Sequence, residues 1–468
     1  MQSLFRKPAI ELAKLIRRKD LSPVELIDAT LRRIEAVNPS INAFVALRAD
    51  GALEEAKVLA EKIAAGIDPG PLAGIPIGVK DMEDTCGMVT SFGSIPFKCN
   101  LVENDSVQVA RLRAAGAIVV GKTNTPEFGF TGFTKNRLYG VTGNPWNPAR
   151  TPGGSSGGAA AAVAGCMVPL ATGSDAGGSI RIPASYCGCF GLKPSYGRIP
   201  LGPLPALHMS RTWHLGPLSR TVTDAALYLD CGTGYHPADP DSLPHPNLSY
   251  AGCLEKLPTN LKIGFSPDLG YVRVQKDVAV AVDRALKAFE DLGHTVEIWQ
   301  GKFPRVDDAW SKLMTYELYA IIHHQLDDIR SEMGRTLVNE LDQAKKLSVH
   351  DFIAIQKARA KLNDTLAGFF TKFDLLLTPT MPTEAFAAKG PPPDEIDGYP
   401  INLLDAVAFT YPFNLTGHPA ATVRAGFTVN GLPAGLQIIG PRYRDDLVLQ
   451  AAYAYEQIRP WNDAWPSL

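Results

Sequence analysis

The stretch GGSSGGAAAAVAGCMVPLATGSDAGGSIRIP, residues 153–183, contains the most informative part of this 468-residue chain. Glycines and serines stand near both ends of the stretch, and alanine dominates the part between them. Residues 159–173 predict a closely packed helix followed by a strand. A helix and a strand in direct succession, with glycine-rich loops beside them, favour an α/β fold whose loops carry the function.

Upstream of this stretch, the chain predicts helices and then a buried strand. Ser22 is typical of a helix cap, since a proline follows it and Glu25 stands at the third helical position. Residues 52–65 (ALEEAKVLAEKIAA) predict a second helix. The Pro and Gly residues of PGPLAGIPIGVKD then end that helix, before a short apolar strand that reaches Lys80.

The rest of the chain predicts strands with helices between most of them. The expected helix 105–115 is followed by expected strands at 117–120, 260–268, 294–301, 373–380, 419–427 and 433–440. Residues 309–370 are the most helical and most charged segment, and we expect them to form an insertion or cap. Neither a repeat nor a linker divides the chain, so a single α/β domain over residues 1–468 is the simplest prediction.

Composition narrows the class of partner. Charged residues make up 20% of the chain, and 46 basic residues balance 48 acidic ones to a net charge of -2. This balance argues against nucleic acid or an anionic membrane as a partner, so a small-molecule substrate is expected. No run of about 18 uncharged apolar residues predicts a membrane span. The seven cysteines lack zinc-site spacing, and with no secretory signal we expect free thiols in a cytoplasmic protein.

Residues 116–123, GAIVVGKT, match the phosphate-binding pattern G-x-x-x-x-G-K-[ST]. That pattern needs a loop between its glycines, a strand before it and a helix after it. Here the residues between the glycines themselves predict a strand, and a helix precedes them. We therefore expect no nucleotide, and the sequence indicates no other cofactor and no metal.

Residues 153–157, GGSSG, match the nucleophile elbow of α/β-hydrolases, G-x-S-x-G. An elbow needs a strand that leads directly into it. The preceding residues, NPWNPARTP, contain three prolines, which make such a strand improbable. The elbow interpretation is therefore disfavoured.

Ser179 stands behind two glycines in GSDAGGSIRIP, residues 173–183. Glycine pairs allow successive backbone N–H groups to turn inward as an anion-binding nest. If Ser179 attacks a carbonyl, the amides of Ala176, Gly177, Gly178 and Ser179 are placed to stabilise the negative charge that develops. The alternative is a tight turn that carries an exposed serine, and the spacing alone does not choose between them.

Lys80, at the end of the IPIGV run, is a candidate base for this serine. A lysine acts as a base only if its pKa falls from about 10.4 toward 7 or 8, which requires burial or nearby positive charge. The apolar run favours burial. The alternative is a surface lysine paired with Asp81, Glu83 or Asp84.

Taken together, these residues resemble the amidase signature family. The family's pattern joins a GGSS-G-G block to a G-S/T-D-x-G-G-S-I-R block, and here Ser155 and Ser179 stand at the family's separation of 24 positions. Lys80, in GIPIGVKD, occupies the position of the family's lysine. The similarity extends to GKTNTPEFG, GNPWNPARTPGGSSGG, GLKPSYGRIP, GPLSRTVTDAA, TPTMP and LPAGLQIIG, and is weakest between about residues 235 and 370.

The resemblance implies a role for each residue of the motif. Ser179 would be the nucleophile, Ser155 the relay that passes its proton on, and Lys80 the final base, so that no histidine is needed. It also implies a cis peptide bond between Gly154 and Ser155. The implied supporting residues are Gly154, Ser156, Asp175 and Arg181.

Substrate contacts are also implied. Family members line the substrate channel with the segment after PEFG, which here is FTGF, residues 130–133, and the Gly129 carbonyl would face the active site. Phe130 would contact the acyl group, although ordinary core packing is the alternative for both Phe130 and Phe133. Trp213, His214 and the helical segment from residue 309 are weaker candidates for the leaving-group side.

The resemblance implies a large mixed central sheet with helices on both faces, and a hydrolase of carboxylic amide bonds, with carbamate and ester bonds as further candidates. The inserted helices and the phenylalanines favour small neutral substrates with an apolar or aromatic acyl group. Water is the second substrate, and family members often form homodimers. Two alternatives stay open: the glutaminase subunit of a tRNA-dependent amidotransferase, and a non-catalytic receptor on the same fold.

Overall fold

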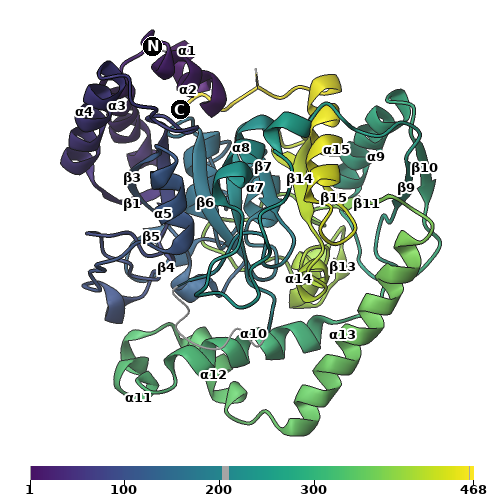
Figure 1. Ribbon diagram of the computed structural model, residues 1–468. Coiled ribbons are helices and arrows are strands. Elements are labelled where there is room, and N and C mark those ends of the chain that lie inside the picture. The colour runs from purple at the N-terminus through teal and green to yellow at the C-terminus, as the bar shows by residue number, and fades with distance from the viewer. Residues whose placement is uncertain (1, 203–209, 463) are drawn as a thin grey trace.

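A mixed sheet of eleven strands forms the centre of the computed structural model, which describes residues 2–202, 210–462 and 464–468 (Figure 1). Its strand order is β1-β3-β2-β6-β8-β7-β14-β15-β11-β9-β10. The strands are β1 (Phe44–Leu47), β2 (Pro76–Lys80), β3 (Ile118–Thr123), β6 (Leu170–Asp175), β7 (Phe190–Lys193), β8 (His214–Ser219), β9 (Lys262–Phe265), β10 (Thr295–Ile298), β11 (Leu375–Pro379), β14 (Ala420–Phe427) and β15 (Pro433–Ile439).

The pairing of the strands brings Lys80 and the serine-rich segment together. Strand β2 runs parallel to both β3 and β6, and Gly78 lies opposite Ala171. Because parallel neighbours end at the same edge of a sheet, the carboxyl ends of β2 and β6 lie side by side. Lys80 therefore leaves the sheet next to the segment that follows residue 172.

Helices cover both faces of this sheet, which confirms the predicted fold class. The helices are α1 (Gln2–Arg6), α2 (Ala9–Arg17), α3 (Pro23–Ile41), α4 (Ala49–Ala64), α5 (Val107–Ala114), α6 (Gly157–Ala164), α7 (Arg181–Cys187), α8 (Val222–Gly232), α9 (Lys276–Asp291), α10 (Asp307–Ile322), α11 (Leu326–Ile329), α12 (Arg335–Ala344), α13 (Val349–Phe370), α14 (Tyr411–Leu415) and α15 (Asp445–Ile458).

Short elements complete the description. Two small hairpins pair β4 (Lys135–Asn136) with β5 (Gly140–Val141) and β12 (Glu395–Ile396) with β13 (Tyr399–Pro400). Single 3-10 turns are η1 (Ile95–Phe97), η2 (Glu127–Gly129), η3 (Ala251–Cys253), η4 (Arg330–Glu332) and η5 (Leu403–Val407).

Local sequence signals place several elements as expected. The Ser22 side chain accepts from the Val24 amide, and Glu25 accepts from the Ser22 amide, so the predicted start of α3 is confirmed. Strands β9, β10, β11, β14 and β15 all fall within the predicted segments. The helix expected at 52–65 begins three residues earlier, at Ala49.

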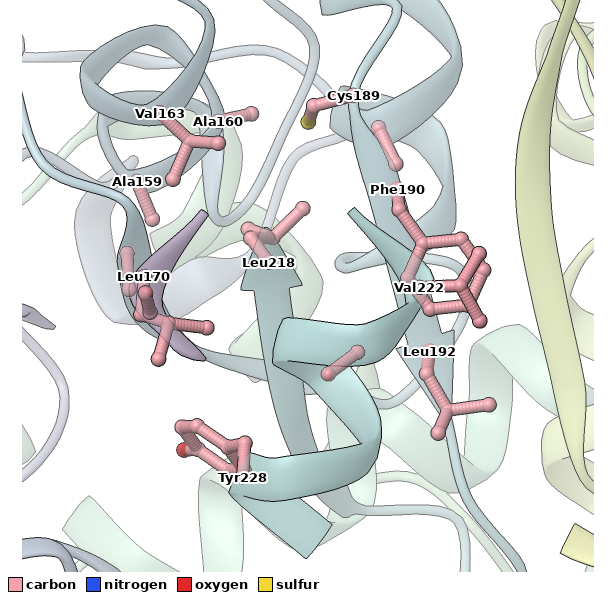
Figure 2. Packing of buried hydrophobic residues seen from close by; sticks show 14 of the residues in the cluster. Ala159, Ala160, Val163, Leu170, Cys189, Phe190, Leu192, Leu218, Val222 and Tyr228 are labelled. Carbon is pink, nitrogen blue, oxygen red and sulfur yellow. The ribbon is translucent and has the colours of Figure 1, made fainter. Parts of the chain in front are cut away.

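Small residues make the core beside the serine-rich loops. All eight residues of α6 are buried, and its alanines bring the helix close to the strands. Figure 2 shows Ala159 and Val163 of α6 in one cluster with Leu170 of β6 and Leu218 of β8. A close-packed helix of this kind holds the loop before it rigidly against the sheet.

Strand β8 was not predicted, although it lies near the middle of the sheet between β6 and β7. Its sequence HLGPLS contains Gly216 and Pro217, which sequence rules exclude from central strands. Every residue of β8 is buried, so tertiary burial outweighs local preference here. The neighbouring strand β7 and the edge strand β1 were also absent from the prediction.

The phosphate-loop interpretation is excluded by the backbone. Residues 118–123 of the GAIVVGKT match form the fully buried strand β3, so no loop lies between the two glycines. Lys122 is buried and donates to the Glu83 carbonyl and to Thr90 Oγ1. The nucleophile-elbow interpretation fails for the expected reason, because no strand leads into Gly153.

Helices α10 to α13 form the segment expected to be an insertion or cap, and in Figure 1 α11 and α12 lie at the bottom of the molecule while α13 rises along its right side. The segment from α10 to α12 forms a small core with Phe128, built from Ile322, Leu326, Met333, Leu337 and Leu341. Helix α13 and the first half of α10 instead pack into the core beside β11, β14 and β15. Across the described ranges, no helix combines the length and apolar character needed to cross a membrane.

Candidate active site

Lys80 directs its ammonium nitrogen at two hydroxyl groups. Its Nζ lies 2.7 Å from Ser155 Oγ, 2.9 Å from Ser174 Oγ and 3.4 Å from the Ser174 carbonyl oxygen. The side chain is completely buried, at 0% exposure. The structure therefore rejects the alternative of a solvated surface lysine and brings Lys80 together with Ser155.

Burial changes the acidity of this lysine. Desolvation lowers the pKa of Lys80 from its ordinary 10.5 to about 7, although Glu83 and Asp175 act in the opposite direction. A lysine with such a pKa is partly unprotonated at neutral pH, and its neutral amine can accept a proton. The Lys80 amide is also fixed, since it donates to Thr172 Oγ1 at 3.0 Å.

Ser155 follows a cis peptide bond to Gly154, as the family resemblance implied. Gly154 lies where a side chain does not fit, because a Cβ atom there would come within 2.7 Å of the Phe133 amide nitrogen. On its other side Ser155 faces Gly129, where a Cβ atom would lie 3.1 Å from Ser155 Oγ. Gly129 thus lies beside Ser155.

Ser179 lies in the turn between β6 and α7. The Ser156 amide donates to the Ser179 carbonyl at 3.1 Å, which joins the two glycine-rich loops directly. Ser156 Oγ donates to the Ser174 carbonyl at 3.3 Å, so Ser156 ties its loop to β6 as well. Ser179 is half-buried, whereas Ser155 and Ser156 are buried, so Ser179 is the most accessible of these three serines.

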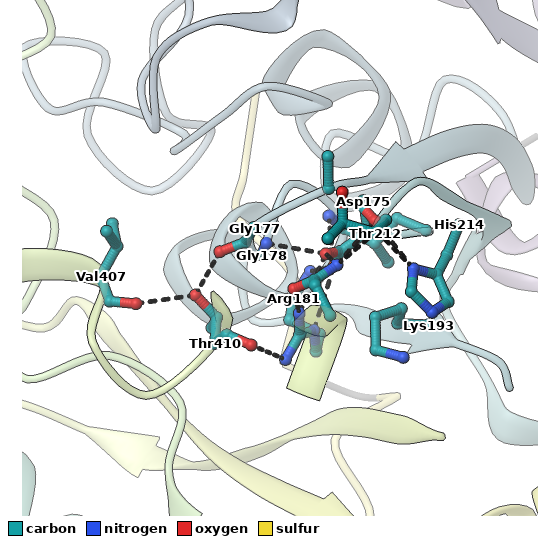
Figure 3. A network of polar contacts seen from close by, with 12 residues as sticks. Asp175, Gly177, Gly178, Arg181, Lys193, Thr212, His214, Val407 and Thr410 are labelled. Carbon is teal, nitrogen blue, oxygen red and sulfur yellow. Dashed lines mark hydrogen bonds and ion pairs between the residues drawn. The ribbon is translucent and has the colours of Figure 1, made fainter. Parts of the chain in front are cut away.

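Asp175 and Arg181 form a fully buried ion pair beneath this turn (Figure 3). Arg181 Nη2 donates to Asp175 Oδ1 at 2.9 Å and Nε donates to Oδ2 at 3.0 Å. Burial acts to raise the pKa of Asp175, but the Arg181 guanidinium outweighs it and holds that pKa well below its ordinary value. The pair is therefore charged and sets the shape of the turn.

The backbone amides of the turn do not all point the same way. The Gly178 amide donates to Asp175 Oδ1 at 2.7 Å, and the Ile180 amide donates to Oδ2 at 3.1 Å. Asp175 therefore already occupies one of the four amides expected to hold an oxyanion. The amides of Ala176, Gly177 and Ser179 do not take part in this network.

Sequence reasoning missed several residues of the site. Thr172 and Ser174, which both contact Lys80, occupy alternate positions of β6. Small hydroxyl residues two apart on a buried strand are the signal that identifies them, since alternate side chains share one face. Trp310, Thr410 and Asn414 also contact the Asp175–Gly177 backbone, but they come from distant segments and carry no local signal.

The expected substrate residues border an apolar region. Phe130 is half-buried and packs with the small core of α10 to α12. Phe92, Phe97 and Phe128 form a set of stacked and edge-on ring contacts at 5.5 to 5.7 Å beside it. Phe133 instead packs against Phe386 at 5.8 Å.

His214 is buried beside the turn. Its Nδ1 lies 2.6 Å from the Thr212 carbonyl oxygen, and His214 pairs with Asp175 across strands β8 and β6. Its neighbour Trp213 is half-buried and packs against the main core. Over the residues that the structure describes, no group of three or more His, Cys, Asp or Glu side chains is arranged to hold a metal ion.

Known proteins match this chain along nearly its full length. A family model described as Amidase matches residues 25–449. An acylamidase of Rhodococcus erythropolis is 39% identical over 471 residues, which cover 100% of this chain and 98% of that protein. One subunit of the glutamyl-tRNA(Gln) amidotransferase of Thermosynechococcus vestitus is 36% identical over 98% of this chain and 99% of its own.

The fold agrees with these sequence matches. The crystal structure of a bacterial aryl acylamidase of the amidase signature family superposes with a TM-score of 0.92, at 33% identity, covering 98% of this chain and 97% of that one. The chain therefore belongs to the amidase signature family. It is a hydrolase of amide C–N bonds, which confirms the activity implied by its motifs.

Proposed function

We propose that the chain hydrolyses amides by acyl transfer to Ser179, with Ser155 as the proton relay and Lys80 as the base. One observation supports this proposal above all others: the buried amine of Lys80 lies 2.7 Å from Ser155 Oγ. A neutral amine at that distance takes the Ser155 proton while Ser155 takes that of Ser179. Ser179 Oγ then bonds to the substrate carbonyl carbon.

The proton returns along the same path. When the tetrahedral intermediate collapses, Ser155 delivers its proton to the leaving nitrogen and recovers one from Lys80. The C–N bond breaks, the amine leaves and the acyl group stays on Ser179. Water then attacks this ester and gives a proton to the same relay. The bond between Ser179 Oγ and the acyl carbon breaks, the relay returns the proton to Ser179, and the carboxylic acid is released.

The oxyanion of the tetrahedral intermediate is stabilised by backbone amides of the turn. We assign this role to the amides of Ala176, Gly177 and Ser179, which the Asp175 carboxylate does not occupy. Gly178 is assigned to holding the backbone of the turn, since its amide donates to Asp175. Asp175, Arg181 and Ser156 support the turn without contacting the substrate.

The substrate class follows from the residues around Gly129. The ring cluster of Phe92, Phe97 and Phe128, with Phe130 beside it, favours an apolar or aromatic acyl group on a small neutral amide. The acylamidase relative and the aryl acylamidase structure support this choice. Carbamates and esters of similar shape would use the same acyl transfer and are proposed as secondary substrates.

Helices α10 to α13 are proposed to act as a cap over the acyl side of the site. The small core of α10 to α12 packs against Phe130, and Trp310 of α10 contacts the Ser179 turn. The seven cysteines are free thiols, and four of them are buried, which supports a reducing, cytoplasmic location. A homodimer remains our expectation for the assembly.

Substitution of the nucleophile tests the proposal. We expect Ser179→Ala to lower kcat by roughly 10⁴- to 10⁶-fold, because only binding and oxyanion stabilisation remain. The measurement is hydrolysis of a panel of anilides, alkylamides, carbamates and esters, ranked by kcat/KM. Ser185→Ala is the matched control, because the Ser185 hydroxyl is buried without a hydrogen-bond partner. A Ser179→Ala variant with the wild-type rate would disprove the proposal.

A glutaminase subunit is the second candidate, favoured by the 36% identity to the amidotransferase relative. The same panel separates the two functions when glutamine is included. The chain purified by itself should prefer a hydrophobic anilide to glutamine, whereas a glutaminase subunit should prefer glutamine. A third alternative, a non-catalytic receptor, predicts no labelling of Ser179 by a serine-directed phosphonate.

A further inference from the structure

The turn before Ser179 is held from outside by three side chains of the C-terminal half. Asn414 Nδ2 donates to the Asp175 carbonyl at 2.7 Å, Trp310 Nε1 donates to the Ala176 carbonyl at 2.9 Å, and Thr410 Oγ1 donates to the Gly177 carbonyl at 2.6 Å. Figure 3 shows Thr410 between Val407 and Gly177. Three successive carbonyls of the turn are therefore fixed by three different side chains.

Holding a carbonyl also aims the next amide. In a trans peptide the C=O and the following N–H lie in one plane and point in opposite directions. The Ala176–Gly177 peptide is trans, since the cis bonds of the described ranges are Gly154–Ser155 and Gly390–Pro391. Because Trp310 holds the Ala176 carbonyl, the Gly177 N–H must point away from Trp310.

The other two carbonyl contacts have different consequences. Thr410 holds the Gly177 carbonyl and so directs the Gly178 N–H to its observed partner, Asp175 Oδ1. Asn414 directs the Ala176 N–H in the same manner. The contact made by Trp310 is the one that aims the Gly177 amide, a central donor in the proposed oxyanion site.

Trp310 is itself held in one orientation. Its ring stacks on Tyr411 with centroids 5.0 Å apart and planes inclined by 15°. Its edge lies so close to Gly177 that a Cβ atom there would be 2.1 Å from Cζ2, and only glycine fits. Tyr411 is fully buried, so the indole has a rigid support on one side and the turn on the other.

We propose that Trp310 is a positioning residue for the oxyanion site: by holding the Ala176 carbonyl, it aims the Gly177 amide at the charge that develops on the substrate. The inference rests on the proposed acyl transfer to Ser179. It also gives helix α10 a part in the chemical step, because the residue comes from the segment expected to be a cap.

The test removes the indole N–H and keeps an aromatic ring. We expect Trp310→Phe to lower kcat for an anilide by about tenfold to hundredfold, with KM changed less than about twofold, because a misaimed donor affects the transition state alone. The inhibition constant of an aryl trifluoromethyl ketone, which forms a tetrahedral adduct with a serine, should rise by the same factor as kcat/KM falls.

Trp461→Phe is the matched control, because Trp461 Nε1 donates to the Arg220 carbonyl at 2.8 Å, in a buried position outside the turn. It should leave kcat and the inhibition constant within about twofold of wild type, although it too loses one indole hydrogen bond. Replacement of Trp310 by 3-benzothienylalanine, which keeps the ring shape and lacks the N–H, should reproduce the Trp310→Phe defect. Thermal unfolding shows whether each variant is folded.

The outcomes separate this inference from the proposed function. Wild-type kcat and inhibition constant in both Trp310 variants would overturn the positioning role, as would a raised KM with unchanged kcat. If the wild-type chain hydrolyses no amide, the proposed function fails, and the rate at which a fluorophosphonate labels Ser179 becomes the readout. Labelling should then be slower in the Trp310 variants than in Trp461→Phe, and equal rates would overturn the inference.

Discussion

In the proposed mechanism, Lys80 combines the burial of a core side chain with the chemistry of a base. Its amine contacts two serine hydroxyls and a carbonyl, and its side chain is inaccessible to solvent. Charged lysine is costly in such a place, so the neutral form is favoured. The same desolvation that weakens the charge therefore prepares the group to accept a proton.

The pH dependence of the rate follows from this desolvation. Because burial lowers the pKa of Lys80 to about 7, kcat/KM should rise about tenfold per pH unit below that value and level off above it. The measurement is kcat/KM for an uncharged anilide between pH 5 and 9. Lys80→Arg, which stays protonated, should lose the rise together with most of the activity. A wild-type profile that falls through pH 7 would contradict the lysine-base mechanism.

At the scale of residues, the sequence predicts the motif and misses its surroundings. Lys80, Ser155 and Ser179 can be proposed as site residues from spacing and resemblance, because the motif is local to three short segments. Ser174 has a weaker local signal, its alternation with Thr172 on one strand. Trp310 has none, since its contact with Ala176 spans 134 positions of the chain.

At the scale of elements, the junction of β6 and α7 is organised by one buried ion pair. Asp175 closes the strand and Arg181 opens the helix, so their contact bends the chain around Ser179. Arg181 also donates to the Thr410 carbonyl and to Gln437 Oε1, which ties the junction to the C-terminal part. Because both partners have many hydrogen bonds, the Asp175–Arg181 pair holds the turn, and loss of either partner should disrupt it.

Removing the arginine should therefore destabilise the protein. We expect Arg181→Ala to lower the free energy of unfolding by about 3–5 kcal/mol at pH 7, because it leaves the Asp175 charge buried and unpaired. The pKa of Asp175 is depressed in the folded state. The pair therefore stabilises the folded protein fully above the ordinary carboxyl pKa, and this stability is lost as pH falls from that value through the lower folded pKa. The difference in free energy of unfolding between Arg181→Ala and wild type should thus become smaller below about pH 4.

Urea denaturation at pH 7 and at about pH 3, below the ordinary carboxyl pKa of about 3.9, measures this effect. Arg444→Ala is the matched control, because Arg444 pairs with Asp446 and its side chain is 49% exposed. Arg444→Ala should lower the free energy of unfolding by less than about 1 kcal/mol. If Arg181→Ala and Arg444→Ala lowered the free energy of unfolding equally at pH 7, this result would contradict the role assigned to the buried pair.

The elements themselves were predicted unevenly, for a physical reason. Strands β11, β14 and β15 have apolar runs bounded by turn residues, so their sequences identify them. Strand β8 contains Gly216 and Pro217 and is recognisable only once its neighbours β6 and β7 bury it. Strands whose stability comes from tertiary contacts are hidden from local reasoning.

At the scale of the whole molecule, the strand order is the part that no sequence pattern gives. The hairpin of β14 and β15 lies between β7 and β11, so strands separated by more than two hundred residues are neighbours. The fold class could be predicted because helices and strands alternate along the chain. The order could not, because it depends on contacts between distant segments.

The buried base should also carry a cost in global stability. The unfolded chain keeps Lys80 protonated up to its ordinary pKa of 10.5, whereas the folded pKa is about 7, so the folded state loses stability below pH 10.5. Lys80→Met should therefore raise the free energy of unfolding by roughly 2–4 kcal/mol at pH 7, after the lost hydrogen bonds are considered. The increase in free energy of unfolding over wild type should become smaller as pH rises toward 10.

Chemical denaturation of both proteins at pH 7 and pH 9.5 measures the gain. Lys57→Met is the control, since Lys57 is 61% exposed and pairs with Glu54 on the same helix. That variant should change stability by less than about 0.5 kcal/mol at either pH. If Lys80→Met were less stable than wild type at pH 7, the inference that burial of the Lys80 amine destabilises the folded protein would be wrong.

The three side chains that hold the carbonyls before Ser179 have a consequence for synthesis of the protein. The ribosome delivers the lysine and both serines within the first 179 residues, but Trp310, Thr410 and Asn414 emerge much later. A chain released early, or one that stalls in its second half, would carry the reactive hydroxyl without the scaffold that aims its amides. If Ser179 acylates as proposed, fragments that end before Asn414 should be inert.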